Sequence, residues 1–157
     1  MSNHQELLAR YAAGSQRLRQ ATAGMTDQQA AAHPVPGKWS TLEVACHLAD
    51  METVFTERMK RVLIEDRPAL PNADENAYAS ALADDQRALA DEVAVVEATR
   101  RQMLRILGSL PAAAFARAGI HSTAGPLTLA QLLDKVTGHL EHHVKFIDEK
   151  RQALGLS

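Results

Sequence analysis

Four long stretches of the chain carry apolar side chains three or four residues apart, and this spacing constrains the fold more than any other feature. The stretches cover residues 3–23, 40–64, 74–107 and 128–154. A period of 3.6 residues is typical of amphipathic helices that bury one face. The chain also contains 28 alanines, and alanine is the best helix former. The sequence therefore predicts an all-α protein, a four-helix bundle.

Short extra helical turns are expected in the connections between these helices. The third stretch is long for one helix, and we expect a break before Asp84, whereas residues 65–73 and 119–126 hold prolines, glycines and polar residues and are predicted to be loops. Residues 112–118 are predicted to form one more turn, so the topology need not be simple up-down-up-down. Three capping boxes predict helix starts: Thr26 with Gln29, Ser40 with Glu43, and Thr128 with Gln131.

Length and composition limit the function classes. The 157 residues suit a single domain, residues 1–157. A net charge of −2 argues against a nucleic-acid partner, which would require a basic stripe. No apolar run approaches the roughly 20 residues of a membrane span, and the start of the chain lacks the apolar core of a signal peptide. With Cys46 as its single cysteine, the chain is expected to be a cytoplasmic protein that binds neither nucleic acid nor membrane.

Three histidines are predicted to face the core of the bundle. At about 100° per residue, His47 lies about 40° from Met51, the centre of the apolar face of its helix. His139 and His143 lie about 60° and 20° from Val136 on the last helix, whereas His142 lies about 120° away, at the helix edge.

Histidines four residues apart on a helix have Cβ atoms about 5–6 Å apart and can chelate one ion. A third imidazole from a facing helix would complete a three-histidine site with an open coordination position for water or substrate. Zinc suits such a site, and nickel, iron, copper or manganese are alternatives. The alternative for a single core histidine such as His47 is a hydrogen-bonded packing role. Three inward imidazoles need polar partners, however, and a shared metal would supply one.

Three charged residues near this face have two interpretations each. Arg58 lies about 20° from the face centre, where its guanidinium would bind a carboxylate of substrate or thiol, or reach the bundle end and pair with an acid such as Glu57. Asp50 and Glu43 would orient the second ring nitrogen of His47, or lie at a solvated helix edge.

The remaining candidates are predicted to be structural or exposed. Trp39 is expected in the core, and Cys46 is expected to be an inert thiol. His4, His33 and His121 are expected to be exposed.

At these residues the sequence resembles the DinB/YfiT-like family of metalloenzymes. The resemblance spans residues 37–150 and rests on six segments: Gly37–Ser40, Glu43–Asp50 with its E-x-x-x-H-x-x-D pattern, Arg58, Pro71–Glu75 with Tyr78, Leu127–Leu133, and His139–His143 with its H-x-x-H-H pattern. The resemblance implies a four-helix bundle in which His47, His139 and His143 hold a divalent metal. It also implies that a homodimer is common. Two positions depart from the YfiT-like branch, where histidines often stand in place of Glu52 and Phe146.

The resemblance implies an enzyme that transfers a thiol such as bacillithiol or mycothiol to electrophilic small molecules in detoxification or stress response. A coordinating metal deprotonates a thiol, and the thiolate is the nucleophile. A metal-dependent hydrolase that activates water is an alternative. A non-enzymatic bundle with a structural or sensing metal, or a metal-free interaction module, is a third interpretation. A small-molecule substrate is the expected partner.

Overall fold

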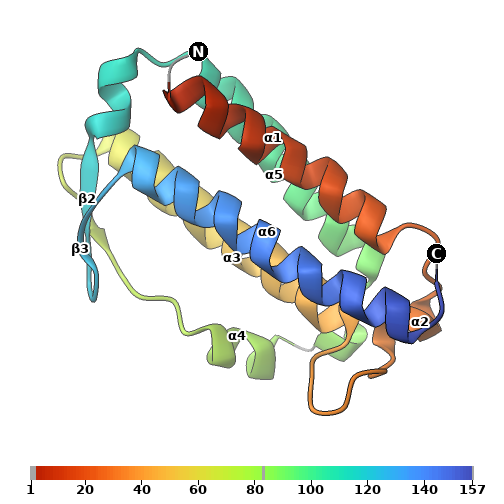
Figure 1. Cartoon of the computed structure of the whole chain (residues 1–157). Coiled ribbons are helices and arrows are strands. Elements are labelled where there is room, and N and C mark those ends of the chain that lie inside the picture. The colour runs from red at the N-terminus through yellow and green to blue at the C-terminus, as the bar shows by residue number, and fades with distance from the viewer. Residues whose placement is uncertain (1–2, 83, 157) are drawn as a thin grey trace.

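The computed structural model describes residues 3–82 and 84–156. It confirms the predicted four-helix bundle (Figure 1). The long helices are α1 (Asn3–Thr22), α3 (Thr41–Ile64), α5 (Leu89–Gly108) and α6 (Leu129–Ala153). The capping boxes at Ser40 and Thr128 start α3 and α6, as the sequence predicts.

The bundle does not have up-down-up-down topology. Helices α1 and α6 run in one direction, whereas α3 and α5 run in the other (Figure 1). Helix α6 packs against α1 and α3, and α5 packs against the same two helices. The long segment between α3 and α5 therefore returns along the side of the bundle, so that two parallel helices lie next to each other.

The connections contain the short helical turns that the sequence predicts. Helix α2 (Asp27–Ala31) follows α1, and a 3-10 turn at Ala112–Ala116 follows α5. The segment between α3 and α5 contains helix α4 (Glu75–Ala81) and a 3-10 turn at Asp84–Gln86. The predicted third stretch is thus two helices, as its length suggested, with the turn at Asp84–Gln86 between them.

The two predicted loops contain a small sheet, and that part of the sequence interpretation was wrong. Strand β1 (Ala69–Leu70) pairs in parallel with β2 (Ala118–His121), which pairs antiparallel with β3 (Gly125–Thr128). Strands of two to four residues are too short to show an alternating apolar pattern. The packing of the bundle, rather than the local sequence, places β1 next to β2. Gly119 permits the close approach, since a Cβ there would lie 2.7 Å from the Leu70 side chain.

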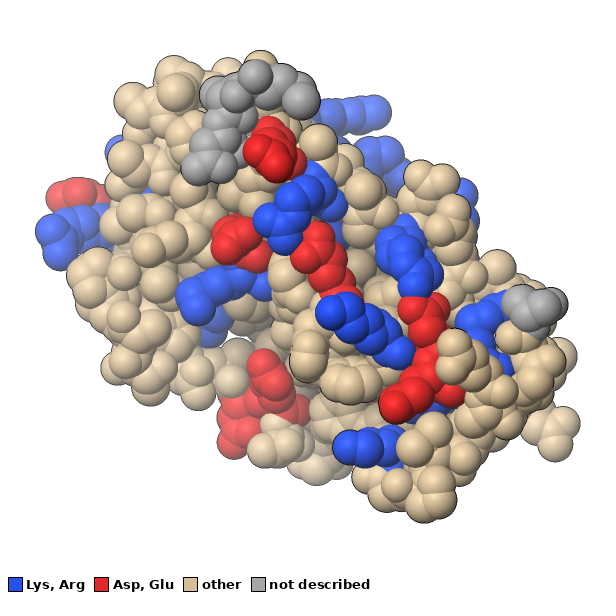
Figure 2. Space-filling model, in the orientation of Figure 1, with Lys and Arg blue, Asp and Glu red and all other residues tan. Residues whose placement is uncertain are grey.

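Between α1 and α6, ion pairs join the helices at the surface. Arg10 pairs with Asp134 and Glu141, and Arg17 pairs with Asp148. Figure 2 shows acidic and basic side chains interspersed on this face of the molecule. Among the described residues, no helix has the length and hydrophobicity needed to cross a membrane.

A polar network lies in the middle of the otherwise apolar core. Arg100 of α5 is completely buried and donates two hydrogen bonds to Glu52 Oε2, at 2.9 and 2.8 Å. The Tyr11 hydroxyl donates to the other oxygen of Glu52 at 2.6 Å. Arg100 also donates to the carbonyl oxygens of Tyr11 and Val136. The network therefore links all four long helices through groups that have lost their contact with water.

Gly14 of α1 makes room for this network, and we expect Gly14→Ala to destabilise the protein. A Cβ at residue 14 would overlap the guanidinium of Arg100, and overpacking a well-packed core typically costs about 1–3 kcal/mol. Chemical denaturation measures the change. Gly138→Ala is the control, because a Cβ there meets nothing within 4 Å, and removing a helical glycine should stabilise α6 by roughly 0.5–1 kcal/mol. Equal stability of the two variants would contradict the prediction.

Candidate metal centre

The structure brings the three inward-facing histidines together between α3 and α6. The ring centroids of His47, His139 and His143 are 4.6–4.8 Å apart. The Nε2 atoms of His47 and His139 lie 2.8 Å apart, and one ligand atom from each of the three residues lies within 4.8 Å of the others. This is the trio that the helical spacing selects.

Local sequence explains why the rings converge. The Ser40 capping box starts α3 two turns before His47, so His47 points into the bundle and is 3% exposed. His139 and His143 are one turn apart on α6 and lie one above the other. Because α3 and α6 are antiparallel neighbours, the single ring from α3 meets the pair from α6.

The chemistry of the three rings fits a divalent metal. Burial, together with the neighbouring imidazoles, lowers the pKa of His139 to about 3 and the pKa of His143 to about 4. Burial lowers the pKa of His47 as well, so all three groups are uncharged at neutral pH, which is the form that binds metal. In the described part of the chain, the Nδ1 atoms of His47 and His143 are buried without a hydrogen-bond partner. Three uncharged imidazoles, each with a ligand atom within 4.8 Å of the others, are well suited to Zn²⁺ or Ni²⁺.

The stability of the metal-free protein should fall as the pH falls from about 6.5 towards 4. Both His139 and His143 have folded-state pKa values below the ordinary value, which is about 6.5 in the unfolded chain. In this window the unfolded state binds more protons than the folded state, so the free energy of unfolding decreases with decreasing pH.

Urea unfolding of chelator-treated protein at pH 7.5 and 5.5 measures this decrease. The double variant His139→Gln with His143→Gln is the control, and its decrease should be smaller. An identical decrease in both proteins would contradict the assignment of the effect to these rings.

The structure does not place Asp50 or Glu43 against His47, which corrects that part of the sequence prediction. Asp50 accepts two hydrogen bonds from Arg87, both at 2.9 Å. Glu43 accepts from the backbone of Ser40 and contacts His33 Nε2 at 2.9 Å. Each carboxylate is committed to holding an element in place: Asp50 holds the start of α5, and Glu43 caps α3.

Glu75 is the acidic residue that the structure places near the triad. It is the first residue of α4, and its Oε2 lies 3.9 Å from His47 Nε2. Its side chain is 55% exposed. In the sequence, Glu75 belongs to a connecting segment of the family resemblance and no pattern predicts a role for it, because its position depends on how the segment between α3 and α5 returns along the bundle.

A recess opens beside His143. It has a volume of about 240 Å³ and is lined by apolar, aromatic and basic side chains: Gly37, Lys38, Trp39, Val44, His143, Phe146 and Lys150. Trp39 is half-buried, and its ring centroid lies 5.4 Å from that of His47. Trp39 packs against the apolar core, as the sequence predicts, and it also lines this recess.

Arg58 lies at a second recess, of about 470 Å³, between α3 and the segment that leads into α4. The recess is lined by Thr53, Val54, Glu57, Arg58, Pro71, Asn72, Ala73, Asp74, Ala77 and Tyr78. Arg58 is 6% exposed and donates a hydrogen bond to the Pro71 carbonyl at 2.6 Å. Burial lowers the pKa of Arg58, and no described carboxylate lies within ion-pair distance of it. The pairing with an acid at the bundle end is thus not observed.

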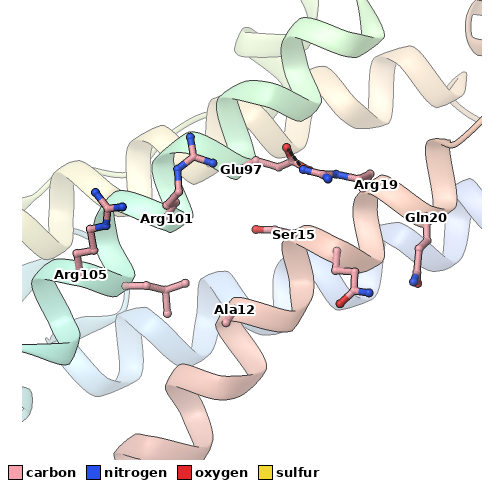
Figure 3. Close-up of a pocket in the computed structure, with 9 residues that line it drawn as sticks. Ala12, Ser15, Arg19, Gln20, Glu97, Arg101 and Arg105 are labelled. Atoms are coloured by element: carbon pink, nitrogen blue, oxygen red, sulfur yellow. Dashed lines mark hydrogen bonds and ion pairs between the residues drawn. The ribbon is translucent and has the colours of Figure 1, made fainter.

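A separate groove of about 680 Å³ lies between α1 and α5, away from the two recesses described above (Figure 3). Arg19 and Glu97 pair across it through hydrogen bonds of 2.6 and 2.7 Å. None of the three histidines lines it. Arg101 and Arg105 extend along its α5 side (Figure 3).

The other histidines and Cys46 lie outside the triad. His142 and His33 are exposed, as predicted, but His121 is half-buried and His4 is half-buried and stacked on Phe115 at 4.4 Å. Those two expectations of exposure were wrong, because His4 packs on Phe115 and His121 Nδ1 accepts hydrogen bonds from the backbone of Thr123 and Ala124. Cys46 is completely buried, and burial raises the pKa of its thiol to about 12, which agrees with an inert thiol.

Fold and site together define a class of protein: a four-helix bundle whose facing helices carry three converging histidines. The sequence model of the DinB superfamily matches residues 10–147. The chain therefore belongs to the DinB superfamily.

Two curated relatives carry names that mention a metal. "Putative metal-dependent hydrolase YfiT" from Bacillus subtilis (strain 168) is 31% identical over 143 residues, which cover 90% of this chain and 80% of the relative. "Putative metal-dependent hydrolase OB0413" from Oceanobacillus iheyensis is 21% identical over 131 residues, which cover 83% of this chain and 75% of the relative.

Solved structures share the fold. YfiT from Bacillus subtilis, whose four-helix bundle topology is described as unusual, superposes with a TM-score of 0.90 at 26% identity, over 100% of this chain and 91% of that one. The four-helix bundle protein TT2238 superposes with a TM-score of 0.67 at 19% identity, over 94% of this chain and 99% of that one. The latter similarity shows the fold alone.

Proposed function

We propose that the protein is a metal-dependent enzyme in which His47, His139 and His143 hold zinc or nickel. We further propose that it transfers a low-molecular-weight thiol, such as bacillithiol or mycothiol, to electrophilic small molecules in detoxification or stress response. The convergence of three uncharged imidazoles carries the proposal. A divalent ion bound there would lower the pKa of a coordinating thiol or water molecule and so supply a nucleophile at neutral pH.

The number of ligands supports a reactive centre over a structural one. Structural zinc sites are closed by four protein ligands, whereas catalytic sites keep one position open. The group of converging ligands among the described residues has three members, all histidines.

Two recesses support a reaction between two molecules. The recess at Arg58 and the recess at His143 share no lining residue, so a thiol compound and an electrophile can be held separately. In this scheme Arg58, which lines its recess, binds a carboxylate of the thiol compound. Glu75 accepts the thiol proton. The sulfur then forms a bond to the electrophilic carbon, the bond to the leaving group breaks, and the leaving group departs with the electron pair and takes the proton from Glu75.

Hydrolysis is a second candidate, and the position of Glu75 favours it. A carboxylate 3.9 Å from a ligand nitrogen can take a proton from a water molecule at the open position as readily as from a thiol. The printed names of both curated relatives also mention a hydrolase. Water then takes the place of the thiol, Glu75 accepts the water proton and returns it to the leaving group, and Arg58 has no thiol compound to bind.

Metal analysis and product analysis together test the function. Untagged protein is purified without chelator, and its metal is measured by plasma mass spectrometry. The metal-loaded protein is then incubated with monochlorobimane and bacillithiol, mycothiol or glutathione, and in parallel with aryl esters and no thiol. We expect one metal per chain and thiol-dependent adduct formation. Ester cleavage without thiol would identify the hydrolase, and protein that takes up no metal would contradict both.

Glu75→Gln tests the proton acceptor in either reaction. General base catalysis typically contributes about 10²–10⁴-fold, so the variant should lose activity by that factor while it retains its metal. Glu6→Gln is a matched control, because that glutamate is likewise exposed and lines neither the recess at Arg58 nor the recess at His143. Unchanged activity of Glu75→Gln would remove Glu75 from the scheme.

Three further features are proposed from the sequence and the family resemblance. We propose a small-molecule partner, a cytoplasmic location and a homodimer whose alanine-rich helices pack closely. Light scattering tests the last of these, and a mass of twice the 17.1 kDa chain is expected.

A further inference from the structure

The recess beside His143 contains a buried cation that the scheme above does not use. Lys150, near the end of α6, is 2% exposed. Its ammonium group donates a hydrogen bond to the Phe146 carbonyl at 3.0 Å and forms no ion pair with a described residue. An ammonium group has three N–H donors, and buried lysines are normally paired. Two donors of Lys150 thus lack a protein acceptor.

The surroundings of Lys150 combine apolar walls with positive charge. Trp39, Val44 and Phe146 line the recess, and the Lys150 ammonium lies 5.8 Å from the centre of the Phe146 ring. Lys38, which is exposed, adds a second positive charge to the lining. His143 forms another part of the wall, and Lys150 is close enough to contribute to its lowered pKa. A molecule in this recess is therefore held between a cation and the metal-ligating triad.

A purely structural role explains these features less well. A lysine that packs its methylene groups on the bundle usually keeps its charged end in water. Here the residue is 2% exposed, and burial, with Lys38 nearby, outweighs the opposite effect of the Glu149 and Glu43 carboxylates and lowers the pKa of Lys150. An anion in the recess would supply the missing acceptor and reverse that shift.

We propose that this recess binds a small carboxylate with an apolar body, with Lys150 pairing with the carboxylate and with Trp39 and Phe146 packing against the body. The recess has a volume of about 240 Å³, which is the volume that roughly eight water molecules occupy in liquid water. The ligand is therefore small. In terms of the proposed function, on which this assignment rests, the ligand is the electrophilic substrate, because apolar walls suit its body better than a polar thiol compound. Binding itself needs no metal.

Trp39 is the single tryptophan of the chain, so its fluorescence reports on this recess directly. Chelator-treated protein is titrated with benzoate and with benzamide, which is similar in shape but uncharged. We expect benzoate to bind at least tenfold more tightly than benzamide. Lys150→Met should lower benzoate affinity at least tenfold and leave benzamide affinity within threefold. Lys145→Met, at an exposed lysine of the same helix, should leave both unchanged.

Two results would overturn the proposal: equal affinity for benzoate and benzamide, or undiminished benzoate binding by Lys150→Met. If Lys150→Met fails to fold, Lys150→Arg replaces it. Because the arginine keeps the charge, it should retain the preference for benzoate, and loss of that preference would equally count against an anion site. The titration contains no metal, so its failure is distinguishable from failure of the proposed function. If the protein prefers benzoate but takes up no metal, the proposal of an anion site is supported and the proposal of a metal-dependent enzyme is contradicted.

Discussion

Replacing His139 or His143 with alanine is expected to reduce bound metal from about one ion per chain to less than a tenth, because each substitution removes one of three ligands. Even the loss of a group that merely supports a ligand typically weakens metal binding 10–100-fold, so loss of a ligand should cost on the order of 100-fold or more. Plasma mass spectrometry after gel filtration measures the content. Free Zn²⁺ at 100 times its Kd should raise the free energy of unfolding of the native protein by about 2.7 kcal/mol. The two alanine variants should lack this increase.

His142→Ala is the matched control for these variants. His142 is adjacent to His143 and its ring lies 5.2 Å from the His143 ring, but it is exposed and is no member of the converging group. It should therefore retain its metal almost fully. Retention of metal by His139→Ala or His143→Ala would show that the triad is not the site.

Arg100→Met is expected to lower the free energy of unfolding by about 3–5 kcal/mol, the usual result of breaking a buried ion pair on one side. Arg100 and Glu52 are 0% and 2% exposed in their side chains, so the substitution leaves the Glu52 carboxylate buried without its cation. In a domain of this size, such a loss lowers the melting temperature on the order of 10 °C. Chemical denaturation and calorimetry measure both quantities.

Two further variants show whether the unpaired charge causes the loss. Arg101→Met changes the next residue of α5, which is exposed, and should alter stability by less than about 0.5 kcal/mol. The triple variant Tyr11→Phe, Glu52→Leu, Arg100→Met removes every polar side chain of the network, and apolar replacement of a buried ion pair is often neutral or stabilising. The triple variant should thus recover most of the stability, and a loss as large as that of Arg100→Met alone would contradict this explanation.

Glu52 occupies a position at which the YfiT-like branch often has a histidine. The structure shows what the glutamate does there. The carboxylate is held by Arg100 and by the Tyr11 hydroxyl, and it takes no part in the converging group of ligands. The substitution therefore changes the packing of the core beside the site and leaves the three histidines in place.

The sequence alone predicted the helices, their capping boxes and the three histidines that converge. These features depend on interactions between residues a few positions apart, since a helical period of 3.6 residues places His47, His139 and His143 on apolar faces. The break in the third stretch was expected because that stretch is long for one helix. Once two such faces are buried against each other, their inward-facing polar groups must meet.

The tertiary structure decided everything that depends on contacts between distant segments. The crossover between α3 and α5 brings Glu75 to the triad and pairs β1 with β2, and neither contact leaves a periodic signal in the sequence. Asp50 and Glu43 are near His47 in sequence, but Arg87 and the cap of α3 hold them elsewhere. Lys150 lies in the last turn of α6, where a basic residue is ordinary, and only the recess formed with Trp39 shows that its charge is buried. Local periodicity places the three histidines on buried helix faces because it acts within one helix, whereas packing between helices determines which groups surround them.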